Sequence, residues 1–312
     1  QVLSDIKGGN GDTTLLLFGR KYTPNQHAIS EKFVLLDNFY VDSEVSADGH
    51  HWTMGAYSTD FMEKSWPTSY GGKGGGIYGE PEKNVVMNKS GYIWDLCNRY
   101  GVSYRTYGEF MTGNKPAIAS LDKHFHPTFP SYSLAIMDTT RLRIWKTEFQ
   151  EMVKENRVPQ FNSIRLGNDH TEGLRLGRPT PYAHVADNDL AVGQLIETLA
   201  NSPIWNESVV FIIEDDAQNG ADHVDAHRST AYVAGGFVKR NFIDHTAYTT
   251  SSMLRTMELI LGLNPMSQYD AAAMPMWRSF DSVAKPIDFK AIIPKIDLGG
   301  RNVARNEWQR RS

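Results

Sequence analysis

The sequence has few of the features that mark membrane-spanning, disulfide-rich or nucleic-acid-binding proteins. It contains a single cysteine, Cys97, so an internal disulfide is excluded. The position of Cys97 is typical of a packed thiol on the apolar face of a helix. No apolar run reaches the roughly 18 residues of a membrane span, which predicts no transmembrane segment. The net charge is −4, and lysine and arginine are scattered, so nucleic acid is not an expected partner.

Apolar runs with strand character alternate with segments of helical period along the chain. This pattern predicts an α/β fold with a mostly parallel central sheet covered by helices on both faces. We expect one domain over residues 1–312, with residues 286–312 forming a surface tail. The predicted strands are 32–41, 102–110, 160–166, 208–215 and 229–238, and the predicted helices are 48–62, 90–100, 141–156, 183–200 and 249–262. Two long stretches without periodicity, 69–84 and 112–133, are expected to shape a site.

Ionisable residues are concentrated directly behind the strand 208–215. The segment "EDDAQNGADHVDAHRS" (214–229) holds four aspartates, one glutamate and two histidines. Ligands bind beyond the carboxyl ends of strands in open α/β sheets, and a cation would remove the repulsion between Asp215 and Asp216. The alternative is a solvated acidic loop, but His223 and His227 in the same loop favour a metal site.

A second group, Asp169 and His170, follows the predicted strand 160–166. Its position at the end of a strand places it at the same topological level as Asp215, so the two groups could share one site. Aspartate together with histidine suits Zn²⁺ or Mn²⁺ better than calcium, which prefers oxygen ligands alone. Either residue could instead cap the following turn.

Ser46 lies between the strand 32–41 and a helix expected to begin near Asp48. Its structural interpretation is a helix N-cap. Its chemical interpretation is a nucleophile, because free N–H groups at a helix N-terminus suit an incoming phosphate and a neighbouring metal would lower the pKa of the hydroxyl.

Three of these segments resemble the alkaline phosphatase superfamily. "VSADGHHWTMGA" resembles the nucleophile segment of cofactor-independent phosphoglycerate mutases. "VVFIIEDD" and "DAHRSTAYVAG" are similar to the superfamily's strand that ends in metal ligands and to its late metal histidine. The chain as a whole looks most like the phosphoesterase branch of bacterial phospholipases C and acid phosphatases, in domains often found behind a β-propeller.

The resemblance implies a hydrolase that acts on a small-molecule or lipid phosphate ester through a phosphoserine, with two divalent metal ions, Zn or Mn. A sulfatase fits less well, because Ser46 lacks the Cys/Ser-x-Pro-x-Arg context. The implied residues are Ser46 as nucleophile; Asp215 and Asp216 on one metal; Asp169, His170 and His227 on the other, with His223 as the alternative histidine; and His50 and Arg228 near the phosphate. Packing for His50 and a charged cap for Arg228 are the ordinary alternatives.

The resemblance also leaves one ligand unaccounted for. The family carries an early acidic or amide ligand just upstream of a segment like "QVLSD", whereas this chain begins at Gln1. We therefore expect that the chain is part of a longer polypeptide, that it lacks the family's first strand and that a β-propeller lies upstream. The alternative is that Asp5 or Asp37 takes the place of the missing ligand. The start and the resemblance predict a periplasmic or extracellular location. The competing hypothesis is a catalytically incomplete, metal-stabilised binding or surface module.

Overall fold

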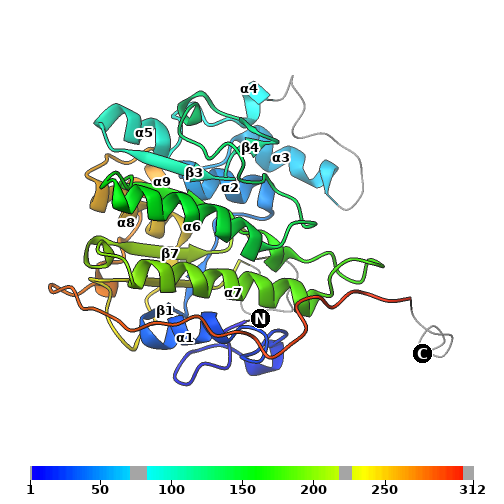
Figure 1. The fold of residues 1–312 in the computed structure, drawn as a ribbon. Helices are drawn as coiled ribbons and strands as arrows, with labels where there is room; N and C mark the ends of the chain where they lie inside the picture. The colour runs from blue at the N-terminus through cyan, green and yellow to red at the C-terminus, as the bar shows by residue number, and fades with distance from the viewer. Residues whose placement is uncertain (1, 71–82, 218–226, 305–312) are drawn as a thin grey trace.

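The protein is an α/β structure in which helices cover small sheets (Figure 1). The computed structural model describes residues 2–70, 83–217 and 227–304. Its largest sheet has the order β7-β8-β1-β9, from Val209–Ile213, Ala231–Gly235, Val34–Leu36 and Phe242–Asp244. Strand β8 is antiparallel to both β7 and β1, whereas β1 and β9 are parallel. The α/β class is confirmed, but this sheet is mixed rather than mostly parallel.

Parallel pairing is also found in two short two-stranded sheets. Strand β3 (Tyr104–Tyr107) lies parallel to β6 (Phe161–Ile164), and β2 (Phe39–Tyr40) lies parallel to β10 (Tyr248–Thr249). A hairpin joins β4 (Met111–Thr112) to β5 (Lys115–Pro116). Each predicted strand range thus contains a strand, shorter than expected.

The helices follow the predicted pattern with one division. Ala56 adopts a left-handed conformation (φ 60°) and Thr59 caps the next helix, so the predicted helix 48–62 is two helices, α2 and α3. Helices α1, α4 and α9 were not predicted. The α-helices are α1 (Pro24–Lys32), α2 (Ser46–Gly55), α3 (Asp60–Ser69), α4 (Lys83–Val86), α5 (Ile93–Tyr100), α6 (Asp138–Lys154), α7 (Pro181–Ala200), α8 (Thr250–Leu261) and α9 (Gln268–Ala272). Short 3₁₀ helices are η1 (Thr13–Leu15), η2 (Ala119–Leu121), η3 (Asn168–His170), η4 (Trp205–Glu207) and η5 (Trp277–Ser279).

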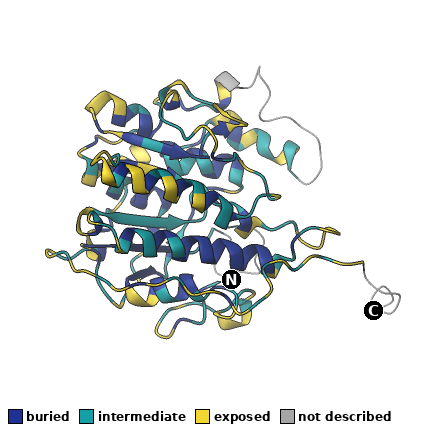
Figure 2. Ribbon diagram, viewed as in Figure 1, coloured by how far each residue is buried: buried dark blue, intermediate teal, exposed yellow. Residues whose placement is uncertain are grey.

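The main core joins the largest sheet to the neighbouring helices α6 and α7. Helix α6 contributes Trp145 and Phe149, whose rings stack at 4.9 Å, and α7 contributes Leu195. Helix α7 is buried along most of its length, whereas α6 alternates between buried and exposed residues (Figure 2). These two helices therefore form a rigid support for the loops at their ends.

A buried carboxylate in the middle of α7 holds the start of α1. Asp189 accepts hydrogen bonds from the backbone N–H of Asn25 (3.0 Å) and of Gln26 (2.8 Å). Negative charge at a helix N-terminus is stabilising, because the first N–H groups have no partner within the helix. Burial raises the pKa of Asp189 to about 6.

The segment 286–304, part of the predicted surface tail, extends past α1 and α7 (Figure 1). Phe289 is buried, and the side chain of Asn25 exchanges hydrogen bonds with the backbone of Ile292 at 2.7 and 2.6 Å. Among the described helices, none is long and apolar enough to cross a membrane.

A buried glutamate in α8 makes folding sensitive to pH. Burial raises the pKa of Glu258 to about 8, Asp270 acts in the same direction, and Arg255 opposes the shift. Between the usual glutamate pKa and about 8, the folded protein retains a proton that the unfolded chain has released. The contribution of Glu258 to the free energy of unfolding is therefore full at low pH and is lost as pH rises through this window.

We expect the Glu258→Gln variant to lose stability less steeply than the wild type between about pH 5 and pH 8. The difference should be at most about 5 kcal/mol, since one pKa unit corresponds to about 1.4 kcal/mol. Urea unfolding across this pH range measures it, with exposed Glu155→Gln as the control. Parallel pH profiles for wild type and Glu258→Gln would contradict the prediction.

Candidate active site

Ser46 occupies the first turn of α2. Val45 is the N-cap residue in an extended conformation, and the buried carboxylate of Asp48 accepts hydrogen bonds from the N–H groups of Glu44 and Val45, both at 2.9 Å. These bonds set the direction in which the chain enters the helix. The Ser46 hydroxyl then donates to Asp216 Oδ1 at 3.0 Å. Two residues 170 positions apart in the sequence are thus brought together.

The acidic segment that follows β7 lies directly against α2. The carbonyl oxygen of Asp215 accepts a hydrogen bond from Ser43 Oγ at 2.5 Å. A Cβ atom at Gly49 would lie 2.4 Å from the same oxygen, which is closer than a side chain allows. The absence of a side chain at Gly49 therefore permits the close approach that places Asp215 and Asp216 beside Ser46.

His50 is held between two carboxylates. Its Nε2 atom lies 2.9 Å from Asp215 Oδ2, and its Nδ1 atom lies 2.8 Å from Glu109 Oε1. Burial would lower the pKa of His50, but the charges of Glu109 and Asp215 outweigh burial and raise it to about 10. Burial would raise the pKa of Asp215, and the imidazolium outweighs it and lowers that pKa. Both ring nitrogens thus face carboxylates, while the predicted contact of His50 with a phosphate stays a prediction.

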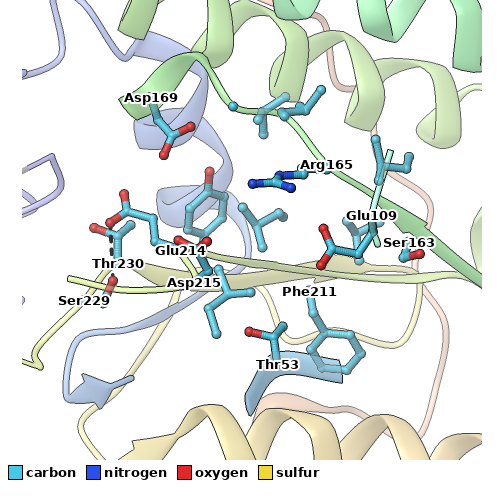
Figure 3. A pocket seen from close by; sticks show the side chains of 18 of the residues that line it. Thr53, Glu109, Ser163, Arg165, Asp169, Phe211, Glu214, Asp215, Ser229 and Thr230 are labelled. Atoms are coloured by element: carbon cyan, nitrogen blue, oxygen red, sulfur yellow. Dashed lines mark hydrogen bonds between the residues drawn. The ribbon is translucent and has the colours of Figure 1, made fainter. Parts of the chain in front are cut away.

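Further carboxylates line the same cavity, which has a volume of about 1580 Å³ (Figure 3). Asp169 is in contact with solvent at the cavity, but many protein atoms surround its carboxyl group. This desolvation raises its pKa well above the usual value, and the negative charges of Glu214, Asp138 and Asp215 raise it further. Burial likewise raises the pKa of Glu214, whose carboxylate accepts a hydrogen bond from Ser229 Oγ at 3.3 Å. The cavity therefore concentrates negative charge that a cation or a cationic group would stabilise.

A buried ion pair at the start of α6 orders the loop that carries Asp169. Asp138 is fully buried, and its carboxylate accepts hydrogen bonds from the N–H groups of Gly167 (3.1 Å) and Asn168 (2.8 Å) and from Asn188 Nδ2 (3.0 Å). Arg141, on the same helix, donates to Asp138 at 3.0 Å. Two consecutive backbone donors next to Asp169 are thereby fixed to α6.

The remaining predicted site residues contact other partners, although His170 and Arg228 also line the cavity. His170 is exposed, and its Nδ1 atom lies 3.0 Å from the carbonyl oxygen of Thr171. The Nε2 atom of His227 lies 3.1 Å from Glu44 Oε1. Arg228 donates to the backbone oxygens of Asn10 and Asp37 at 3.2 and 2.9 Å. His223 lies outside the described residues. Ligand roles for the three histidines and phosphate binding by Arg228 stay predictions.

The carboxylate oxygens of Asp169, Asp215 and Asp216 are donors that suit divalent cations. Asp215 and Asp216 are adjacent, and Asp216 also contacts the hydroxyl of Ser46. Within residues 2–70, 83–217 and 227–304, however, no three histidine, cysteine, aspartate or glutamate side chains are grouped as a metal site. The donor chemistry fits a divalent metal, while the described part of the chain supplies no complete ligand set.

Sequence reasoning missed two residues of this cavity, Glu109 and Arg165. Glu109 follows β3 and Arg165 follows β6, and these strands are parallel neighbours. Both residues lie near the carboxyl end of a predicted strand, 102–110 for Glu109 and 160–166 for Arg165, and that position was the available signal.

The fold agrees with several solved structures at low sequence identity. A protein in the alkaline phosphatase superfamily from Vibrio parahaemolyticus is 15% identical, with a TM-score of 0.55 over 82% of this chain and 64% of that chain. Human ectonucleotide pyrophosphatase/phosphodiesterase 5 is 12% identical, with a TM-score of 0.52 over 84% of this chain and 94% of that chain. A sulfatase from Pseudoalteromonas sp. is 10% identical, with a TM-score of 0.52 over 79% and 64%. This chain thus spans less than two thirds of the Vibrio protein and of the sulfatase.

These structures show that the chain shares its α/β fold with a protein in the alkaline phosphatase superfamily and with a pyrophosphatase/phosphodiesterase. The sequence profile of the Phosphoesterase family matches residues 5–264. The chain belongs to the Phosphoesterase family. No curated protein matches the sequence. Family membership supports a hydrolase of the phosphoesterase type.

Proposed function

We propose that the chain is a metal-dependent phosphoric ester hydrolase in which Ser46 is the nucleophile. The observation that supports this proposal is the 3.0 Å hydrogen bond from Ser46 Oγ to Asp216 Oδ1, in the first turn of a helix and beside Asp215. A hydroxyl at this place has an acceptor for its proton, and it lies in the first turn of α2, where the positive end of the helix dipole favours an incoming anion. Both features suit attack on an anionic phosphoryl group.

In the proposed reaction, Ser46 Oγ forms a bond to phosphorus while the bond from phosphorus to the ester oxygen breaks. Asp216 accepts the proton of the hydroxyl, and the departing alkoxide takes a proton from water. The hydroxide left by that water then attacks the phosphoserine, the bond from phosphorus to Ser46 Oγ breaks to release inorganic phosphate, and Ser46 Oγ takes its proton back from Asp216. His50 holds the carboxylate of Asp215 in place throughout, because its other nitrogen is anchored on Glu109.

Members of this superfamily generally use divalent metal ions. Asp215, Asp216 and Asp169 would hold such ions here, together with the predicted histidine ligands. When bound, Zn²⁺ or Mn²⁺ would lower the pKa of the Ser46 hydroxyl and neutralise charge on the phosphoryl oxygens. A small-molecule or lipid phosphate ester as substrate, a periplasmic or extracellular location and an upstream β-propeller belong to the same proposal.

Hydrolysis of an aryl phosphate by the purified chain, with and without added Zn²⁺ or Mn²⁺, tests the proposal. We expect release of the phenol only with metal, and acid quenching during turnover followed by peptide mass spectrometry should locate phosphate on Ser46. Hydrolysis in the presence of a chelator, or phosphate on a different residue, would contradict the mechanism. Metal binding without any hydrolysis, also from the chain extended at its N-terminus, would favour the binding module instead.

A further inference from the structure

The guanidinium of Arg165 extends into the cavity between the carboxylates. Arg165 follows β6, and its backbone N–H donates to Tyr107 O at 3.0 Å, which continues the pairing with β3 by one residue. Its side chain lies between Asp169 and Asp215 on one side and Glu109 on the other in Figure 3. The positive charge of Arg165 helps to lower the pKa of Glu109 and of Asp215. Arg165 thus acts electrostatically on two carboxylates of the cavity.

Among the described residues, this guanidinium forms no ion pair or hydrogen bond, and its contact is with the ring of Tyr132. The carboxylates that face it are directed elsewhere: Glu109 lies against His50, and Asp215 lies against His50 and the N–H of Asp216. The cavity's other arginine, Arg228, donates to backbone oxygens instead. Arg165 therefore presents N–H donors to the cavity that are available for an anion.

Tyr132 restricts how such an anion can approach. The Arg165 Cζ atom lies 4.8 Å from the centre of the Tyr132 ring, a cation–π contact that covers one face of the guanidinium. A planar guanidinium with a covered face is left to donate in its own plane, where two parallel N–H groups match two oxygens of one phosphoryl group.

The Tyr132 ring is itself held from two sides. A Cβ atom at Gly167 would lie 3.2 Å from the ring, so the loop that precedes Asp169 packs closely against it. Arg141 donates to the carbonyl oxygens of Ser131 (3.3 Å) and Ser133 (2.7 Å), the residues on either side of Tyr132. The orientation of the guanidinium is thus set before any ligand arrives, which reduces the entropy lost on binding.

From these contacts we propose that Arg165, oriented by Tyr132, is the residue that binds the phosphoryl oxygens of the substrate. Two N–H groups of Arg165 donate to two non-bridging oxygens of the phosphoryl group, beside the Ser46 and Asp216 pair. The identity of this anion as the reacting group rests on the proposed function, whereas the capacity to bind phosphate does not. Tyr132 is a positioning residue in this arrangement.

The test is the binding of inorganic phosphate to the Mn²⁺-loaded chain by isothermal titration calorimetry. Arg165→Gln should weaken phosphate binding by roughly 10- to 100-fold, the value of a charge-assisted hydrogen bond or two. Arg165→Lys should weaken binding by about fivefold or more, since an ammonium keeps the charge but cannot form the paired bonds. The matched control, Arg143→Gln on the exposed face of α6, should bind as the wild type does.

The affinity for Mn²⁺ separates recognition from disruption of the site: it should be unchanged or tighter in Arg165→Gln, because a positive charge has been removed. The inference is overturned if Arg165→Gln binds phosphate as tightly as the wild type does. If Arg165→Gln does not fold, wild-type affinity of Arg165→Lys for phosphate overturns it instead. Phosphate binding that depends on Arg165 in a chain that hydrolyses no ester would uphold the anion site and refute the proposed function. If the chain hydrolyses esters but its phosphate binding does not depend on Arg165, the proposed function stands and the anion site at Arg165 is refuted.

Discussion

Replacing Ser46 with alanine is expected to reduce kcat for an aryl phosphate by at least about 10⁴-fold, because removal of a nucleophile leaves only binding and electrostatic stabilisation. The KM should change far less, since the phosphoryl group keeps its other contacts. The hydroxyl donates to Asp216 and is half-buried, so its loss should leave the fold intact. Steady-state kinetics together with circular dichroism and metal analysis measure these three quantities.

The matched control for this variant is Ser90→Ala, which removes an exposed hydroxyl elsewhere in the chain. It should retain full activity. If Ser46→Ala turns over within about tenfold of the wild-type rate with metal content unchanged, a nucleophilic role for Ser46 is untenable. A loss of bound metal in Ser46→Ala would instead show that the hydroxyl is needed for metal binding.

Replacing Asp138 with alanine should lower the free energy of unfolding by about 3–5 kcal/mol, the usual cost of leaving a buried charge without its partner. Arg141, which is 3% exposed, would lose its carboxylate, and the N–H groups of Gly167 and Asn168 would lose their acceptor. Hydrolysis should also fall, because the loop that carries Asp169 loses its attachment to α6. Urea unfolding and steady-state kinetics measure the two effects.

A double variant distinguishes the ion pair from the backbone bonds. Asp138→Asn/Arg141→Met removes both charges but keeps an oxygen for one loop N–H group, and it should recover part of the stability lost in Asp138→Ala. The pair Lys64 and Asp60 on the surface offers the control, since Asp60→Ala removes an exposed ion pair of the same kind and should change stability by less than about 1 kcal/mol. A similarly small change in Asp138→Ala would show that the buried pair does not order the loop.

Several features of the fold and the site could be read from the sequence. The apolar run ending at Ile213 predicted a strand, and the residues behind it, Asp215 and Asp216, do line the cavity. Ser46 was expected just before a helix that begins near Asp48, and α2 begins two residues earlier, at Ser46, with Val45 rather than Ser46 as its N-cap. These predictions depend on local periodicity and on the rule that strands end at a binding edge, both of which are written into short segments.

Features that depend on contacts between distant segments could not be read in this way. The antiparallel arrangement of β8 between β7 and β1 has no local signature, so a mostly parallel sheet was expected. The contact of His50 with Glu109 could not be read from the sequence, because Glu109 lies 59 residues further along the chain (109 − 50). The availability of the Arg165 guanidinium for an anion could not be read from the sequence either, because it depends on which partners the surrounding carboxylates contact.

The sequence by itself determined the α/β class, the position of the acidic segment behind a strand and the serine at the start of a helix, because each follows from the pattern of a few neighbouring residues. The tertiary structure alone decided that Gly49 lets Asp215 approach α2, that Asp138 ties the Asp169 loop to α6, and that Arg165 lies on Tyr132. The physical reason is that hydrogen bonds, ion pairs and close packing act over a few ångströms in space, whatever the separation of their residues along the chain.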